Sequence, residues 1–343
     1  MAEVKADDGW RLGHRRGLDQ LRGLAVLIVL IGHGAAETVL DKAGAVGVIV
    51  FFVLSGFLIT RLLIEERVRT GRIDLRRFYI RRARRLLPAL PLALTLCAMA
   101  NLVMGGHPIL RPAIATSTYT VNFAGEVGAF SHLWSLAVEE HFYLVWPLVM
   151  LVLPLRAVPW VASAGVVSSV VARMTIPDTV IEAYRWTPYR VDAILLGALL
   201  AFAVARTATP RRSTMWAAAI VAAVFAAPSA WDVMLAWGMT AVAVASVVLV
   251  CGALTVAKAR PLLERLGVIS YGAYLYHYPL RGIVFDAAGA PWWFTLPVVL
   301  IGSIALAEVS MRTIEGRFRS KPIEITARTC QPGTTPRPLV PSL

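Results

Sequence analysis

The sequence is short of charge, and this excludes an ordinary soluble domain. Of its 343 residues only 16% are charged, whereas soluble domains average roughly 25%. Hydrophobic residues make up 57% and run almost unbroken over stretches such as 233–257. The regularly spaced polar residues that mark the solvent face of a soluble helix or strand are missing there. The chain therefore has more apolar sequence than a soluble core needs.

Cysteine is also scarce, and this excludes a disulfide scaffold. The chain has three cysteines, Cys97, Cys251 and Cys330, of which two lie inside apolar runs. An odd number of cysteines in these positions does not form a disulfide framework, and no zinc or haem spacing occurs. We therefore expect no metal site and no permanently bound cofactor.

What the chain does contain is a series of apolar windows of about the length that a bilayer requires. They lie near 18–36, 44–64, 86–104, 133–155, 158–172, 189–205, 215–228, 233–256, 268–285 and 292–311. A hydrocarbon layer about 30 Å thick is crossed by about 20 helical residues, whose backbone polar groups are satisfied within the helix. The sequence predicts an all-α, polytopic membrane bundle of about ten transmembrane helices.

The basic residues orient this bundle. The net charge is +13, and the arginines gather in alternate connecting segments, most densely between 65 and 85. Lys42, Arg111, Arg173 and Arg185 are the basic residues expected on the opposite side. Positive charge marks the cytoplasmic side, so we predict that both termini are cytoplasmic and that the protein crosses the membrane several times. Contacts with lipid phosphate or a phosphorylated ligand explain this charge better than nucleic acid does.

One membrane domain accounts for most of the chain. We assign 1–17 to a cytoplasmic leader, 18–318 to the membrane domain and 319–343 to a Pro-rich, disordered cytoplasmic tail. The longest external segment, about 105–132, is expected to carry a short surface helix.

Ionisable residues inside spans are costly and therefore candidates for function. Arg22 and His33 lie eleven residues apart in the first window, which places them on one helix face about 16 Å apart. Arginine suits phosphate or a carbonyl, and histidine suits proton exchange. The alternatives are a snorkelling anchor for Arg22 and an interhelical hydrogen bond for His33.

Two glutamates, Glu139 and Glu140, stand near the outer entry of the fourth window. Successive helical residues point about 100° apart, so one carboxylate can face a cavity while the other reaches a basic partner. The alternative is that both lie in headgroup water.

Two further groups of polar residues have both a functional and a structural interpretation. The run of Arg81, Arg82, Arg84 and Arg85 is either a lipid anchor or a dock for a phosphorylated cosubstrate. The tyrosines around His277 are either an aromatic belt or part of a site.

Seven stretches in collinear order resemble the acyltransferase-3 family of bacterial membrane O-acyltransferases, which includes acetylases of O-antigen and other polysaccharides and acylases of macrolides. They are 18–23 with an Arg-x10-His spacing to His33, then 51–59, 78–88, 134–143, 190–198, 270–279 and 307–315. Two departures are Gln20, where glycine is common, and Ile49, where a charged residue often stands.

The resemblance implies a multi-pass protein of a bacterial inner membrane. It also implies transfer of an acyl group, expected to be acetyl, from cytoplasmic acyl-CoA to a hydroxyl of a carbohydrate, glycolipid or macrolide. Arg22 and His33 match the family's essential pair, and Glu139 and Glu140 match its acidic motif. Arg81, Arg82, Arg84 and Arg85 match its donor-handling segment. Further substrate contacts are expected from Trp134, Tyr143, Arg190, Asp192 and His277.

The mechanism that we expect is direct transfer, with His33 as the general base. Glu139, or failing that Glu140, would orient His33, and Arg22 would stabilise developing negative charge. An acyl-histidine intermediate is the alternative chemistry. The rival function is a transporter or flippase of a lipid-linked sugar or small solute, although the internal repeats common in transporters are not found.

Overall fold

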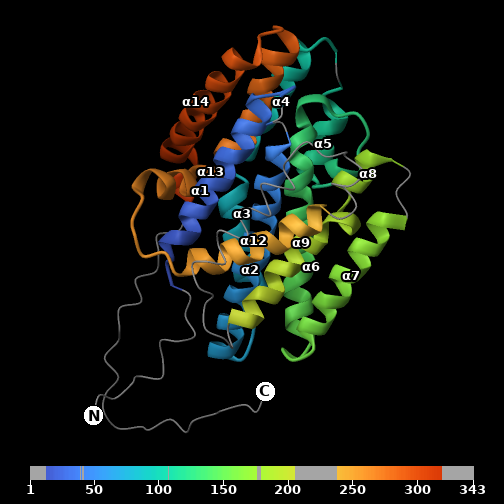
Figure 1. The fold of residues 1–343 in the computed structure, drawn as a ribbon, viewed down its shortest axis with the longest axis vertical. Coiled ribbons are helices and arrows are strands. Elements are labelled where there is room, and N and C mark those ends of the chain that lie inside the picture. Colours follow the sequence, from blue (N-terminus) through green and yellow to red (C-terminus); the bar gives the residue numbers. More distant parts are fainter. Residues whose placement is uncertain are drawn as a thin grey trace.

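The structure is a computed structural model, and it describes residues 13–38, 40, 42–106, 108–175, 179–204 and 238–318. Within these ranges every regular element is helical (Figure 1). The predicted span at 215–228, the beginning of the span at 233–256, most of the predicted leader and the predicted tail lie outside the described residues.

The helices follow the predicted windows closely. They are α1 (Arg16–Gly34), α2 (Ala43–Thr70), α3 (Leu75–Leu86), α4 (Leu90–Val103), α5 (Leu110–Ser117), α6 (Trp134–Val152), α7 (Val158–Thr175), α8 (Val180–Arg185), α9 (Thr187–Val204), α12 (Met239–Leu254), α13 (Pro261–Arg281), α14 (Trp292–Ser310) and α15 (Gly316–Phe318). Short 3-10 segments, η1 (Val121–Phe123) and η2 (Gly128–Leu133), precede α6, and π-helical segments, η4 (Gly282–Ala287) and η5 (Met311–Glu315), follow α13 and α14.

By length and composition, six helices of the described chain can cross a membrane, or seven if the bent pair α3 and α4 counts as one span. This agrees with a polytopic helical bundle. The surface helix expected within 105–132 is α5. One boundary changes the interpretation of the site: the fourth span begins at Gly128, ahead of the predicted 133. Glu139 therefore lies about three turns from the start of this candidate span.

The helices cross closely where glycine faces glycine. Gly23 of α1 meets Gly267 of α13, and Gly56 of α2 meets Gly197 of α9. A Cβ added at any of the four would overlap a backbone carbonyl of the facing helix. Small residues that let backbones approach are the usual means of packing helices in a bilayer. These two crossings fix the helices that carry most of the site residues.

α1 lies at the centre of these contacts. It packs on α13 and α14 on one side and on α2 and α12 on the other (Figure 1). A helix surrounded in this way turns several of its faces toward protein, which explains how one helix can carry two polar residues into the bundle.

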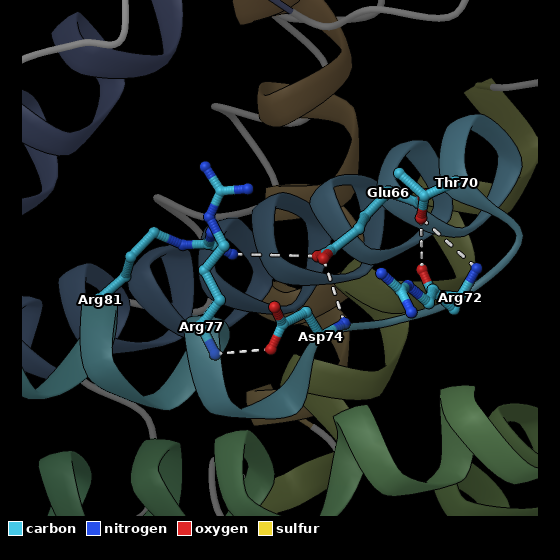
Figure 2. A network of polar contacts seen from close by, with 6 residues as sticks. All are labelled: Glu66, Thr70, Arg72, Asp74, Arg77 and Arg81. Carbon is cyan, nitrogen blue, oxygen red and sulfur yellow. Dashed lines mark hydrogen bonds and ion pairs between the residues drawn. The ribbon is translucent and has the colours of Figure 1, made fainter.

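A polar turn joins α2 to the basic helix α3 (Figure 2). Gly71 ends α2 with φ 73°, a left-handed conformation that glycine adopts at little cost. Asp74 then caps α3 by accepting a hydrogen bond of 2.9 Å from the Arg77 amide, and Glu66 of α2 accepts one of 3.1 Å from the Asp74 amide. The turn ties the start of α3 to Glu66 of α2.

Candidate functional site

A cavity of about 300 Å³ lies between α1, α2, α3, α6 and α13. Its apolar walls come mainly from α2, which contributes Val48, Phe51, Leu54 and Leu58 among others. The polar side chains that line it are His14, Arg15, Asp19, Arg22, Ser55, Arg82, Arg85, Ser135, Glu139, Tyr143, Ser270, Tyr271 and Tyr274. Four arginines against two carboxylates give the lining a net positive charge, so the cavity suits an anionic ligand with an apolar portion.

Arg22 is the cation of this lining with unused hydrogen-bonding capacity. It comes from the middle of α1, and it makes no hydrogen bond or ion pair with any residue that the structure describes. Guanidinium groups offer five donors in a fixed fork that matches phosphate and carboxylate oxygens. Arg22 is therefore placed to bind a ligand in the cavity.

The two glutamates of α6 separate as their spacing predicted. Glu139 faces the cavity and accepts a hydrogen bond of 2.9 Å from Ser55 Oγ and a longer one of 3.4 Å from the Tyr143 hydroxyl. Glu140 accepts a hydrogen bond of 2.8 Å from Arg82, whose guanidinium lies 3.5 Å from the centre of the Tyr143 ring. One carboxylate is thus available to the cavity and the other neutralises a basic partner.

The four arginines predicted to bind the donor lie on two faces of α3. Arg82 and Arg85 line the cavity. Arg84 is exposed, and Arg81 is 46% exposed with its guanidinium 3.9 Å from the Glu66 carboxylate (Figure 2). The helical period separates the pairs, because a residue points about 100° away from its neighbour.

His33 lies outside the cavity, in a cluster of aromatic rings. Its Nδ1 is 3.0 Å from Nε2 of His277. Tyr278 packs edge-on against His33 at 5.4 Å between ring centres and stacks on His132 at 5.1 Å. The expectation that Glu139 orients His33 is wrong, because Glu139 hydrogen-bonds Ser55 and His277 occupies that place beside His33.

The sequence of α13 explains how these histidines are held. Pro279 has no N–H, so the Leu275 carbonyl one turn earlier lacks its helical partner. Nε2 of His132 lies 3.1 Å from that carbonyl oxygen. Nδ1 of His277 lies 2.6 Å from the Tyr274 carbonyl. Backbone carbonyls thus fix both rings.

Tyr274 connects the cluster to the cavity. Its ring lines the cavity, and its hydroxyl donates to the His132 carbonyl at 2.9 Å and lies 2.6 Å from Ser135 Oγ. Its own carbonyl holds His277. The cavity therefore ends against the residue that supports the histidine pair.

Trp134, Arg190 and Asp192 lie together elsewhere and do not line the cavity. The guanidinium of Arg190 lies 5.5 Å from the Trp134 ring centre. Asp192 accepts hydrogen bonds from Arg173 at 3.1 Å and from Thr240 at 2.9 Å. Buried carboxylates and guanidiniums need such partners, so these contacts join α7, α9 and α12. Among the predicted substrate-binding residues, Tyr143 lines the cavity and His277 is part of the histidine cluster.

Ser55, Ser135 and His132 belong to the site although the sequence did not single them out as site residues, whereas Tyr274 is one of the tyrosines around His277 that the sequence offered as part of a site. Ser55 is 84 residues from its partner Glu139, and no local pattern links them. The signal for His132 was indirect: the proline at 279 frees a carbonyl that a polar side chain must satisfy.

Comparisons with known proteins identify relatives of this chain. A family model described as an acyltransferase domain matches residues 15–311. A Staphylococcus aureus (strain MSSA476) protein named "Putative O-acetyltransferase" is 28% identical over an alignment 358 residues long, gaps included. The alignment covers 92% of this chain and 59% of that protein. The O-acetyltransferase OatA of S. aureus (strain NCTC 8325) is 37% identical over 207 residues, or 54% of this chain and 34% of OatA. The chain thus spans less than two thirds of these relatives, and no solved structure gives a significant match.

Proposed function

Because this chain belongs to the acyltransferase-3 family, whose model matches residues 15–311, we propose that it is a membrane O-acyltransferase. It transfers an acetyl group from cytoplasmic acyl-CoA to a hydroxyl of a carbohydrate, a glycolipid or a macrolide. The observation that carries the proposal is a cationic cavity with apolar walls, lined by Tyr274, whose carbonyl holds His277 beside His33.

The cavity supports acyl-CoA as the donor. The phosphates of acyl-CoA match the guanidinium groups of Arg15, Arg22 and Arg85. The arm of acyl-CoA matches the apolar side chains of α2. The thioester end then points toward Ser135 and Tyr274, where the cavity meets the histidine cluster. The acyl group that we propose is acetyl. The names of the relatives also mention acetyl transfer.

His33 is the proposed general base. The acceptor hydroxyl gives its proton to His33 as its oxygen attacks the thioester carbonyl, so a carbon–oxygen bond forms and the carbon–sulfur bond breaks. The proton then leaves with the thiolate as free CoA. Proton transfer of this kind contributes roughly 10²–10⁴-fold to rate. Arg22 stabilises the donor's negative charge, and Glu139, held by Ser55, orients the donor within the cavity.

Release of free CoA tests the proposal. Inverted membrane vesicles that contain the protein receive [¹⁴C]acetyl-CoA with a polysaccharide, a glycolipid or a macrolide. We expect CoA release that requires one acceptor class and an equal amount of label in that acceptor. Vesicles without the protein are the control. If every acceptor fails to release CoA while an intact solute crosses the membrane, the chain is a transporter and the proposal is wrong.

A further inference from the structure

The geometry of the histidine cluster points to a role for His277: it is a positioning residue that sets the tautomer of His33. The inference rests on the proposed function, since it concerns the base of that reaction. It replaces the expectation that His277 contacts substrate, and it supplies the orienting partner that Glu139 does not provide.

The first step is the hydrogen on His277. Its Nδ1 lies 2.6 Å from the Tyr274 carbonyl oxygen. A carbonyl only accepts hydrogen bonds, so Nδ1 must carry the hydrogen. The helix itself therefore decides which nitrogen of His277 is the donor.

The second step is the charge of His277. Its side chain is fully buried, with 0% exposure. The titratable or charged groups around it are His33, His132, Tyr274 and Tyr278, with Arg281 nearby. No carboxylate contacts it among the described residues. Burying an unpaired cation is costly, so the ring is neutral and Nε2 holds a lone pair.

The third step is His33. Because Nε2 of His277 can only accept, Nδ1 of His33, at 3.0 Å, is the donor. Neutral His33 then has its lone pair on Nε2, the nitrogen that takes a proton from the acceptor. In Ser-His-Asp enzymes a carboxylate fixes the tautomer in this way, whereas here a neutral histidine anchored to a carbonyl does so.

The space beside His33 agrees with this assignment. Gly44, at the start of α2, faces Cε1 of the ring, and a Cβ built there would lie 3.2 Å from Cε1, 3.4 Å from Nε2 and 3.5 Å from Nδ1. Gly44 has no side chain, so the space beside this edge of the ring, Nε2 included, can take an acceptor hydroxyl.

Nitrogen NMR of the full chain in lipid bilayers tests the tautomer directly. The chain has six histidines, so ¹⁵N-histidine labelling gives few signals, and comparison with His33→Asn identifies those of His33. We expect a protonated Nδ1 and an unprotonated Nε2 in the wild type. His277→Leu should shift His33 toward the other tautomer, while His277→Gln, whose Oε1 can accept in place of Nε2, should retain the original one. A protonated Nε2 in the wild type, or no change in His277→Leu, would overturn the inference.

Kinetics provide a second readout. His277→Leu should lower kcat for CoA release about 100-fold and leave the KM for acetyl-CoA within about twofold, while His277→Gln recovers most of the loss. Equal losses in both variants, or a raised KM for the donor, would indicate a packing or binding role instead. Thermal unfolding of each variant checks the fold. The NMR result does not depend on turnover, so an inactive wild type with the expected tautomer would reject the proposed function and keep the inference.

Discussion

Two regions of α1 face opposite environments. Around Arg22 there is open space, several cations and an apolar wall, and the guanidinium makes no hydrogen bond with the described residues. Around His33 the rings of His277 and Tyr278 pack within 5.0 and 5.4 Å between ring centres. Eleven residues of one helix, about 16 Å, separate an open cavity that can bind a ligand from a closely packed cluster of rings.

The difference corresponds to two separate chemical tasks. Binding phosphate requires permanent cations with unused donors and room for the ligand. Moving a proton requires a titratable ring in a defined orientation, shielded from water. If α1 divides these tasks between its two regions, variants of one region should change donor binding and variants of the other should change turnover.

The largest effect is expected from His33→Asn. Losing the base should lower kcat by about 10²–10⁴-fold, while the Kd for acetyl-CoA stays within about twofold because His33 does not line the cavity. Single-turnover kinetics and equilibrium binding to the same purified protein measure the two quantities. A large loss of donor affinity would mean that the two regions are not separate.

The opposite pattern, weaker donor binding with the base intact, is expected from Arg22→Gln. A charge-assisted hydrogen bond contributes about 1.5–3 kcal/mol, so we expect donor affinity to fall by roughly 10- to 100-fold. The tautomer of His33 should be unaffected. Titration with acetyl-CoA gives the affinity, and the ¹⁵N spectrum gives the tautomer. An unchanged affinity would remove Arg22 from the donor site.

A smaller effect is expected on α3, where Arg84 is a matched control for Arg85. Arg85→Gln should raise the KM for acetyl-CoA about fivefold at low salt, because Arg85 lines the cavity. The difference from wild type should shrink as added salt screens the charge. Arg84→Gln, on the exposed face, should change KM less than twofold. Equal effects of the two would indicate a general surface potential and no defined binding site.

The smallest effect is expected from Gly44→Ala. The added Cβ would crowd the edge of His33 around Cε1, Nε2 included, so the KM for the acceptor should rise about threefold while donor binding stays constant. Initial rates at varied acceptor concentration measure this. A change in the KM for the donor alone would mean that Gly44 acts on the donor cavity and not on the space beside His33.

Local patterns predicted the fold and part of the site. The shared face of Arg22 and His33, and the divergence of Glu139 from Glu140, follow from the helical period, which is a property of a single segment. The partner of His33 could not be found in this way. His277 is 244 residues distant, and the contact depends on how α1 and α13 pack. Periodicity predicts which side of a helix a residue faces, but it does not predict which side chain lies opposite. It therefore did not show that Glu139 pairs with Ser55 while His277 lies beside His33.

α1 runs from Arg16 to Gly34 with no proline inside it, and its glycine crossing at Gly23 and Gly267 ties it to the helix that carries His277. An unbroken helix has a fixed length, so α1 sets the distance between Arg22, which binds the phosphate end of the donor, and His33, where the donor reacts. The protein would then select donors by the length of the arm between phosphate and thioester as well as by their charge. A donor with a shortened arm would occupy the cavity, compete with acetyl-CoA and remain unreacted.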